Sequence, residues 1–402
     1  MDTDAAPPTN CERAEWVHDR PEIWAVVAMH LGLVGAWRLM LVCQAARVGA
    51  TYFLSTLPGI VVSGGDTAGG RSVSEVWRLD LVTLRWETML NLGTARSRHV
   101  CCAVRGALVV IGGINREALS SVEIIRKGDL GFRGPGSGFT ELPPLSCGEI
   151  FSGAAVAVDE SVSAAGQVLL LGGDICPDSS EESYDDSSDD SYGDDGADDD
   201  ADGSDDDGGH GFSTAHLVDL ATGVCQPQAG LLSRRDDFAA AQLPDGRIAY
   251  AGGGGWYGVP LATSEVWEPL GQGAVTWSRR ELPEMSVERW AGRACALSDG
   301  RFAVIGGVSG GHAGATLSSC EALKVGADEN WELLPSMHDA RYSFACVAVA
   351  GCVVVAGGNG RREWEGKLKT AEVFDEGQGR WFRLPRDLPH DGGLSNMGCA
   401  LL

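Results

Sequence analysis

A pair of adjacent glycines recurs six times in this chain, each time directly after a short apolar run. The first glycine of each pair is Gly64, Gly112, Gly172, Gly252, Gly306 or Gly357, so the spacings are 48, 60, 80, 54 and 51 residues. A fixed period of this length is typical of repeat architectures, in which each repeat is one supersecondary unit. The glycine pairs therefore predict six copies of one unit of about 50 residues.

Each unit has further shared features. A short run with a glutamate follows most glycine pairs, at Glu75, Glu123, Glu265, Glu321 and Glu372. A second run then begins with an aromatic residue, at Trp86, Phe139, Trp277, Trp331 and Trp381. One more apolar run precedes the next glycine pair, and Gly, Pro, Asp and Asn separate the runs, which predicts a four-stranded antiparallel sheet per unit. Six such sheets bury their faces by stacking radially, so we expect an all-β fold, a six-bladed β-propeller.

The first and third units depart from the pattern. The third has His216 near the glutamate position and Cys225 in place of the aromatic residue, and an insertion lengthens it. The first lacks the strand that precedes the glycine-pair strand elsewhere, while the chain ends with GLSNMGCALL, which matches that missing strand. We therefore expect the C-terminal strand to complete the first blade, because this pairing removes the open edge of the sheet.

The pattern of glycine pair, glutamate and tryptophan over residues 58–402 resembles the kelch repeat. The resemblance implies a six-bladed kelch propeller that binds a protein ligand and is not an enzyme. It also implies that the loops after the glycine pairs share one face with the loops that lead into each blade. Some kelch-like propellers are copper oxidases or sugar epimerases, so an enzyme on the propeller face stays a weaker alternative. We predict no metal and no cofactor, since no paired ligand spacing or phosphate loop is present.

The loops of that predicted face are rich in arginine, with some aromatic residues. The guanidinium fork pairs with carboxylates, which favours an acidic peptide motif as ligand. The candidate ligand-face residues are Arg96, Arg98, His99, Arg116, Arg234, Arg235, Trp256, Tyr257, Arg289, Arg341, Tyr342, Arg361 and Arg362. For any single arginine, a solvated surface charge is the competing interpretation.

The repeated glutamates and tryptophans have a structural interpretation. We expect the glutamates to pair with repeated arginines such as Arg96, Arg235, Arg293 and Arg341, and the tryptophans to pack between blades. A buried ion pair of this kind sets the register more than it stabilises the fold.

Residues 19–57 do not follow the strand pattern and predict two helical stretches with a turn near Gly32 and Gly35. One interpretation is a helical lid packed on the propeller. The other is a degenerate F-box, which residues 20–47 resemble, and this implies docking on a Skp1-type adaptor of a cullin ubiquitin ligase. The adaptor-docking candidates are Pro21, Ile23, Leu31, Leu41, Val42 and Cys43, whereas Arg20 and Ala46 depart from the F-box pattern.

The charge of the chain is concentrated in one segment. There are 56 acidic and 31 basic residues, a net charge of −25, and sixteen of the acidic residues lie between Asp178 and Asp207. This segment, 178–209, predicts a disordered acidic insert in the third blade, as does the polar start, residues 1–18, for the N-terminus. The anionic balance predicts no nucleic-acid partner and no membrane partner.

The start of the chain has no secretory pattern, and twelve scattered cysteines read as reduced thiols, which favours a cytoplasmic location with the nucleus as a second compartment. Two main functions therefore stay open. The chain is the substrate-recognition subunit of a Skp1-cullin-F-box-type ligase, or it is a kelch scaffold that tethers cytoskeletal or signalling partners.

Overall fold

The computed structural model describes residues 19–126, 138–158, 165–173, 213–255, 259–269, 277–310, 314–326, 328–361 and 366–402. Residues 1–18 and the acidic insert 178–209 lie outside the described residues, so the two predictions of disorder are not tested.

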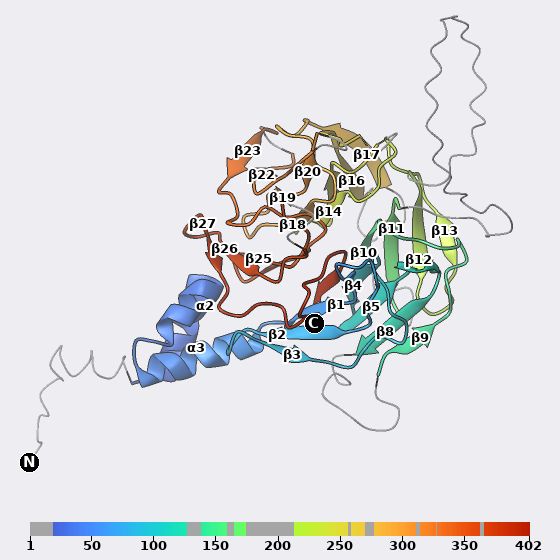
Figure 1. Cartoon of the computed structure of the whole chain (residues 1–402). Helices are drawn as coiled ribbons and strands as arrows, with labels where there is room; N and C mark the ends of the chain where they lie inside the picture. Colours follow the sequence, from blue (N-terminus) through green and yellow to red (C-terminus); the bar gives the residue numbers. More distant parts are fainter. Residues whose placement is uncertain are drawn as a thin grey trace, which may run out of the picture.

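Six four-stranded antiparallel sheets are arranged in a ring (Figure 1), which confirms the predicted six-bladed propeller. From the inner to the outer strand, blade 1 consists of β28 (Gly398–Leu401), β1 (Ile60–Ser63), β2 (Val76–Asp80) and β3 (Arg85–Thr88). Blade 2 consists of β4 (Val100–Val104), β5 (Ala107–Ile111), β8 (Val122–Arg126) and β9 (Thr140–Leu142). Blade 3 consists of β10 (Ala154–Val158), β11 (Gln167–Leu171), β12 (Ala215–Asp219) and β13 (Cys225–Pro227).

The second half of the ring repeats the same order. Blade 4 consists of β14 (Ala239–Gln242), β15 (Ile248–Ala251), β16 (Ser264–Pro269) and β17 (Trp277–Leu282). Blade 5 consists of β18 (Arg293–Ala296), β19 (Phe302–Ile305), β22 (Cys320–Leu323) and β23 (Trp331–Leu334). Blade 6 consists of β24 (Ala345–Val349), β25 (Cys352–Ala356), β26 (Ala371–Asp375) and β27 (Arg380–Arg383). Two small hairpins, β6 (Ile114–Asn115) with β7 (Glu117–Ala118) and β20 (Val308–Ser309) with β21 (Ala315–Thr316), extend from blades 2 and 5.

The core lies between the blades. The second strand of each blade is the apolar run that precedes a glycine pair, and in β1, β5, β15, β19 and β25 every residue is buried. Side chains of neighbouring blades pack together, as Val61 and Ala400 of blade 1 do with Val110 of blade 2. Because such a strand is covered on both sides, its sequence is a continuous apolar run and does not alternate between apolar and polar residues.

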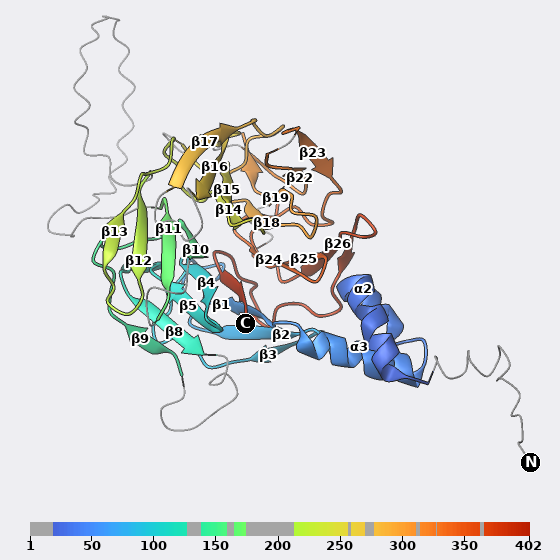
Figure 2. The ribbon, with the colours of Figure 1, turned by 180° about the vertical axis from the view of Figure 1, so that it is seen from behind.

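The C-terminal strand closes the ring. Strand β28 pairs antiparallel with β1, with Gly398 opposite Ser63 and Leu401 opposite Ile60. Backbone bonds between Gly59 and Leu402, at 2.7 and 2.9 Å, extend this pairing. Figures 1 and 2 show the red C-terminal strand beside the blue β1. The predicted closure of blade 1 by the end of the chain is therefore confirmed.

The ring has two faces. The loops after the glycine pairs and the loops that lead into the inner strands lie at one end of the strands, and we call this the glycine-pair face. The turns between the first and second strands and those between the third and fourth strands lie at the opposite face.

Two helices precede the propeller, α2 (Pro21–Leu39) and α3 (Gln44–Thr56), and we call them, with the turn of residues 40–43 between them, the helical segment. They lie at the rim beside blades 1 and 6 (Figures 1 and 2). Buried side chains of α2, such as Leu33 and Leu39, and of α3, such as Phe53, share one core cluster with the strands of these two blades. The helical segment is thus packed onto the propeller, as the interpretation of a helical lid expects.

Helix α2 is interrupted at Gly32, where φ is +69°. The Leu33 N–H donates to the Ala350 carbonyl at 3.1 Å, and a Cβ on Gly32 would lie only 2.8 Å from that same oxygen. Trp37 Nε1 donates to the Leu81 carbonyl at 2.7 Å. Glycine is therefore required at position 32 both for the left-handed backbone and for the close approach to the opposite face.

Among the described residues, α2 alone is long and apolar enough to cross a bilayer by length and composition. Its second half is occupied by packing, since Leu33, Val34 and Ala36 are buried. The break at Gly32 also divides the helix into two short pieces. The second half of α2 is therefore held against the propeller, whereas Val26, Met29 and Leu31 in the first half are exposed.

Candidate protein-binding site

Four blades contain the same buried arginine and glutamate pair. Each arginine lies in the loop that leads into the inner strand, and each glutamate lies on the third strand of the same blade. The pairs are Arg96 with Glu123, Arg235 with Glu265 at 2.6 Å, Arg289 with Glu321 at 2.9 Å, and Arg341 with Glu372 at 2.7 Å. All eight side chains are almost fully buried.

The same arginines also bind the glycine pairs. One guanidinium nitrogen donates to the carbonyl of the first glycine of the pair, as from Arg341 to Gly357 at 2.8 Å. The N–H of the second glycine then donates to the next blade, as from Gly358 to the Leu394 carbonyl at 2.7 Å. The glycine pair, the arginine and the glutamate are therefore parts of one internal brace, which is why they recur together in the sequence.

This brace corrects two expectations. Arg96, Arg235, Arg289 and Arg341 were candidates for the ligand face, but their guanidinium groups lie inside the propeller. Arg293 was expected to pair with a repeated glutamate, but Arg289 holds that position and binds Glu321. Each of these four guanidinium groups is buried and already paired with a carboxylate, so none of them is available to a ligand.

Blades 1 and 3 have other residues at the two positions of the ion pair. In blade 1 the register puts Trp77 at the glutamate position, and Leu394 stands where the arginine stands elsewhere. The expected repeat glutamate, Glu75, lies two residues earlier and before β2 begins, which corrects that assignment. In blade 3, Ile150 and His216 occupy the two positions. Blade 1 therefore has two apolar side chains, packed in one cluster, at the positions where four other blades have the ion pair.

Six residues with left-handed backbones encircle the mouth of the central channel on the glycine-pair face, and we call them the mouth ring. They are Arg98, Ser152, Asp237, Ala291, Ser343 and Asn396. Each N–H donates to the carbonyl of the previous member at 2.7–3.0 Å, and Arg98 donates to Asn396, so the hydrogen bonds form a closed circle. This circle positions one side chain from every blade at the channel mouth.

The sequence analysis included Arg98 as a ligand-face candidate but missed the other five members. In the sequence, the only feature that these residues share is their position. Each lies two residues after the repeated arginine, or after the residue that stands in its place in blades 1 and 3. Because the residue type differs from blade to blade, only the backbone conformation identifies the ring.

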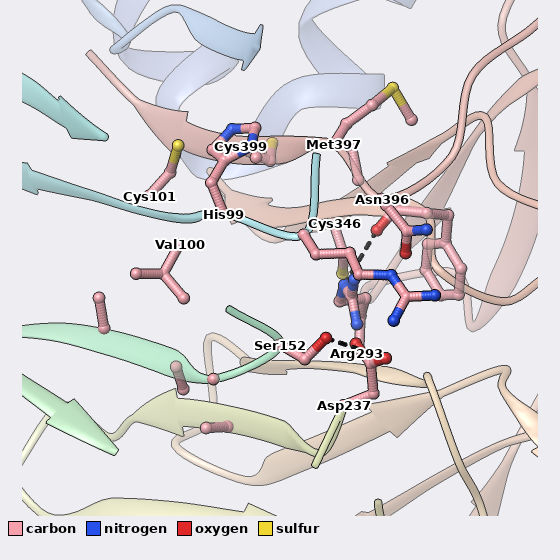
Figure 3. Close-up of a pocket in the computed structure, with 18 of the residues that line it drawn as sticks. His99, Val100, Cys101, Ser152, Asp237, Arg293, Cys346, Asn396, Met397 and Cys399 are labelled. Carbon is pink, nitrogen blue, oxygen red and sulfur yellow. Dashed lines mark hydrogen bonds between the residues drawn. The ribbon is translucent and has the colours of Figure 1, made fainter. Parts of the chain in front are cut away.

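Below the mouth ring, the inner strands surround a cavity of about 160 Å³ (Figure 3). Arg293, Ser152, Asp237 and Asn396 gather on one side of it, and Ser152 Oγ donates to Asp237 Oδ2 at 3.3 Å. Arg293 is fixed by a 3.1 Å bond from Nε to the Phe344 carbonyl. Small-molecule sites usually occupy about 300–1,000 Å³, so this cavity is small for a substrate.

The remaining ligand-face candidates fall into four groups. Arg98, Arg116 and Arg361 are exposed on the glycine-pair face, and Arg234 and Tyr342 are half-buried. His99 is buried, and its burial, with a smaller effect of Arg96, lowers its pKa to about 3, which corrects its assignment to the ligand face. Trp256, Tyr257 and Arg362 lie outside the described residues.

The glycine-pair face carries both signs of charge. Burial and the neighbouring Asp237 raise the pKa of Asp236 to about 6. Lys367 Nζ donates to Ser395 Oγ at 2.6 Å, and burial lowers the pKa of Lys367. The face is therefore less basic than the number of arginines in its loops suggests.

The helical segment presents a second surface. Among the described residues, eleven large hydrophobic side chains are exposed, and seven of them lie in this segment: Val26, Met29, Leu31, Leu41, Val42, Val48 and Tyr52. Of the adaptor-docking candidates, Leu41 is 83% and Val42 is 61% exposed. Cys43 caps α3, since its Sγ accepts from the Ala46 N–H at 3.3 Å.

A groove of about 510 Å³ lies between the two helices, and we call it the helical groove. Pro21, Ala25, Val26, Met29, Val48 and Tyr52 are among its lining residues. Pro21 is thus part of an apolar groove, whereas Ile23 is half-buried outside its lining. The structure brings the docking candidates onto one two-helix unit without placing all of them in one groove.

No cluster of three or more His, Cys, Asp or Glu side chains with a geometry for a metal ion occurs in the part of the chain that the structure describes. A ring of β-sheets with a looped face of mixed charge and a separate apolar helical surface is the arrangement of a protein-interaction module.

Comparison with known proteins agrees with this class. The Kelch motif matches residues 95–126 and 340–386. An F-box/kelch-repeat protein of Arabidopsis thaliana is 39% identical over 74 residues, which is 18% of this chain and 19% of the relative. The chain therefore aligns with only about a fifth of that relative's length. The six blades and the two matched motifs together make this chain a kelch-repeat β-propeller, a fold that generally serves protein interaction.

Proposed function

We propose that the chain is a substrate-recognition subunit in which the glycine-pair face binds a protein ligand and the helical segment docks on a Skp1-type adaptor of a cullin ubiquitin ligase. The apolar surface of the helical segment is the observation that carries this proposal. Monomeric proteins seldom leave a contiguous apolar patch in water, and such a patch on paired helices fits a helical partner.

The placement of the two surfaces supports this function. Helix α2 contacts turns of the opposite face, through Leu33 to Ala350 and Trp37 to Leu81. The mouth ring lies at the other end of the strands. A ligand on the glycine-pair face and an adaptor on the helical segment would therefore not compete for space.

The F-box-like residues and the relative add independent support. Leu31, Leu41 and Val42 match apolar positions of the F-box pattern and are exposed, which is what an adaptor contact requires. The Arabidopsis relative is described as an F-box/kelch-repeat protein. Such a ligase subunit would act in the cytoplasm or the nucleus.

Exposed arginines favour an acidic motif in the ligand. Arg98, Arg116 and Arg361 are on the glycine-pair face, where a guanidinium can bind a carboxylate through two parallel hydrogen bonds. The mixed charge of that face favours a short acidic motif over a long polyanion, because Asp66 and Asp236 repel the latter.

A scaffold without ubiquitin chemistry is the second candidate. The burial of α2 and α3 side chains in the core of blades 1 and 6 favours it, because the helical segment then has a structural task of its own. The same adaptor experiment separates the two functions.

Replacing Leu41 and Val42 with aspartate is expected to abolish adaptor binding while leaving the fold intact. Both side chains are mostly exposed, so their loss costs little stability, whereas two charges in an apolar contact cost several kcal/mol on desolvation. The affinity for a purified Skp1-type adaptor, measured by biolayer interferometry, should fall more than about tenfold. Leu333→Asp, at a 74% exposed site on β23, is the matched control and should bind normally. A wild-type chain that does not bind the adaptor would favour the scaffold.

Selection from a displayed random-peptide library tests the ligand face. The wild-type propeller should enrich acidic peptides, and the double variant Arg98→Glu with Arg361→Glu should lose at least about tenfold in affinity for them. The control reverses two exposed arginines of the opposite face, Arg85 and Arg126. Equal loss in both variants, or enrichment of basic peptides, would contradict recognition of an acidic motif at this face.

A further inference from the structure

Two cysteines meet at the outer seam between blades 2 and 3. Cys147 lies in the connection from β9 to β10, and Cys225 begins β13. The two thiols are neighbours, and both side chains pack against the apolar cluster that blades 2 and 3 share. Two further bonds hold the segments together, from the Ser146 N–H to the Gly223 carbonyl and from the Cys225 N–H to Ser146 Oγ, both at 2.9 Å.

The seams in front of blades 5 and 6 have a different contact at this position. The register places Cys225 opposite Val218, as Trp331 lies opposite Leu323 and Trp381 opposite Phe374. Trp331 Nε1 donates to the Pro283 carbonyl at 2.7 Å, and Trp381 Nε1 donates to the Pro335 carbonyl at 2.8 Å. Blade 3 therefore has a thiol where the outer strands of blades 5 and 6 bind the preceding connection through an indole.

The backbone allows the two segments to approach closely. Gly223 has φ +71°, and a Cβ there would lie 2.2 Å from the Pro144 carbonyl oxygen. Blade 3 also has Ile150 and His216 where four other blades have the ion pair. The seam of blades 2 and 3 thus lacks both the indole contact and the charged brace, and the paired thiols occupy the outer contact.

The two thiols differ in chemistry. The hydrogen bond from the Cys147 thiol stabilises a thiolate on Cys225 and lowers the pKa of Cys225 below that of an ordinary cysteine, with Ser146 adding to the effect. Both cysteines are half-buried, so a small reagent can reach them. Cys295 and Cys346 are also in contact, but Cys295 is buried and its pKa is raised by that contact and by burial.

We propose that Cys147 and Cys225 form a redox-active pair that a small disulfide, such as glutathione disulfide, oxidises to a disulfide bond between blades 2 and 3. The Cys225 thiolate attacks one sulfur of the small disulfide, which forms a mixed disulfide and releases one glutathione thiolate. The Cys147 thiol then loses its proton and attacks the Cys225 sulfur, which releases the second glutathione. Two protein thiols are oxidised, one disulfide is reduced, and the two protons pass to the released thiolates.

Mapping of the full chain after treatment with glutathione disulfide at pH 7 tests the pair. Cleavage after acidic residues separates Cys147 and Cys225 into peptides 142–149 and 220–236, and Cys176 into another. After alkylation of the remaining thiols, mass spectrometry should find these two peptides joined. The bond should raise the melting temperature of the oxidised chain by a few degrees, because it closes a long loop.

Two variants make the result decisive. Cys147→Ser should stop the reaction at a mixed disulfide on Cys225, and Cys346→Ser should leave the joined peptides unchanged. Cys43, which is exposed, serves as a reference thiol in the same digest and should react about tenfold more slowly than Cys225. Peptides joined through other cysteines, or Cys225 still alkylated when Cys43 carries glutathione, would overturn the proposal.

Discussion

Removal of residues 390–402 is expected to open the ring and to lower the stability of the propeller by more than about 5 kcal/mol. The deletion removes β28 and leaves β1 without its inner partner. It also removes Leu394, Met397 and Leu402, which are at most 5% exposed, and each such apolar side chain contributes about 2–5 kcal/mol when it is buried. The mouth ring loses Asn396 and with it two of its hydrogen bonds.

Thermal and urea unfolding followed by circular dichroism measure this effect. We expect a melting temperature lower by more than about 10 °C and a broader transition, because the deletion leaves the inner edge of β1 unpaired. A synthetic peptide of residues 390–402, added in excess, should restore part of the loss, whereas a scrambled peptide should not. Cooperative unfolding at the wild-type temperature would show that the ring does not depend on the C-terminal strand.

Replacement of Glu372 by glutamine is expected to cost about 3–5 kcal/mol, because it removes the nearest charge partner of the buried Arg341 and leaves only Asp339 Oδ2, 3.6 Å away. Glu372 Oε1 accepts from Arg341 at 2.7 Å, and Oε2 accepts from the His338 N–H at 2.8 Å. Both paired side chains are 0% exposed. Glutamine preserves the shape but removes the charge and turns one accepting oxygen into an NH2 donor, so urea unfolding reports the loss of the charge together with the hydrogen bonds that this oxygen accepted.

Other positions of the propeller provide a stabilising double variant and a control for this prediction. Blade 1 has Trp77 and Leu394 at the two positions, so the double variant Arg341→Leu with Glu372→Trp copies a solution that the fold already uses. It should be more stable than Glu372→Gln. The same Glu→Gln change at Glu332, which is 69% exposed beside Arg301, should cost less than about 0.5 kcal/mol. Equal losses at Glu372 and Glu332 would contradict the buried brace.

The architecture was predictable because it is repeated. The apolar run before each glycine pair is a buried second strand, and the last residues of the chain matched the strand that blade 1 lacks. Each of these signals depends on neighbouring residues along the chain. The same weak local pattern occurs six times, and this is why the propeller and its closure could be predicted.

The candidate site was much less predictable. Arg96 and Arg98 are two residues apart in one loop, yet one is buried against Glu123 and the other is exposed. The chain alone gives both the same chemistry, since side chains in a loop have no periodicity that separates inside from outside. The sequence analysis therefore placed four buried arginines on the ligand face and paired Glu321 with the wrong arginine.

The amino-acid sequence by itself determined the number of blades, their strand order and the closing strand, because glycine pairs and apolar runs specify local backbone and burial. Only the tertiary structure decided which arginines face a ligand, which six residues form the mouth ring, and that Cys147 meets Cys225. These features join residues from different strands or blades, so their geometry arises from the packing of the ring and from no single repeat.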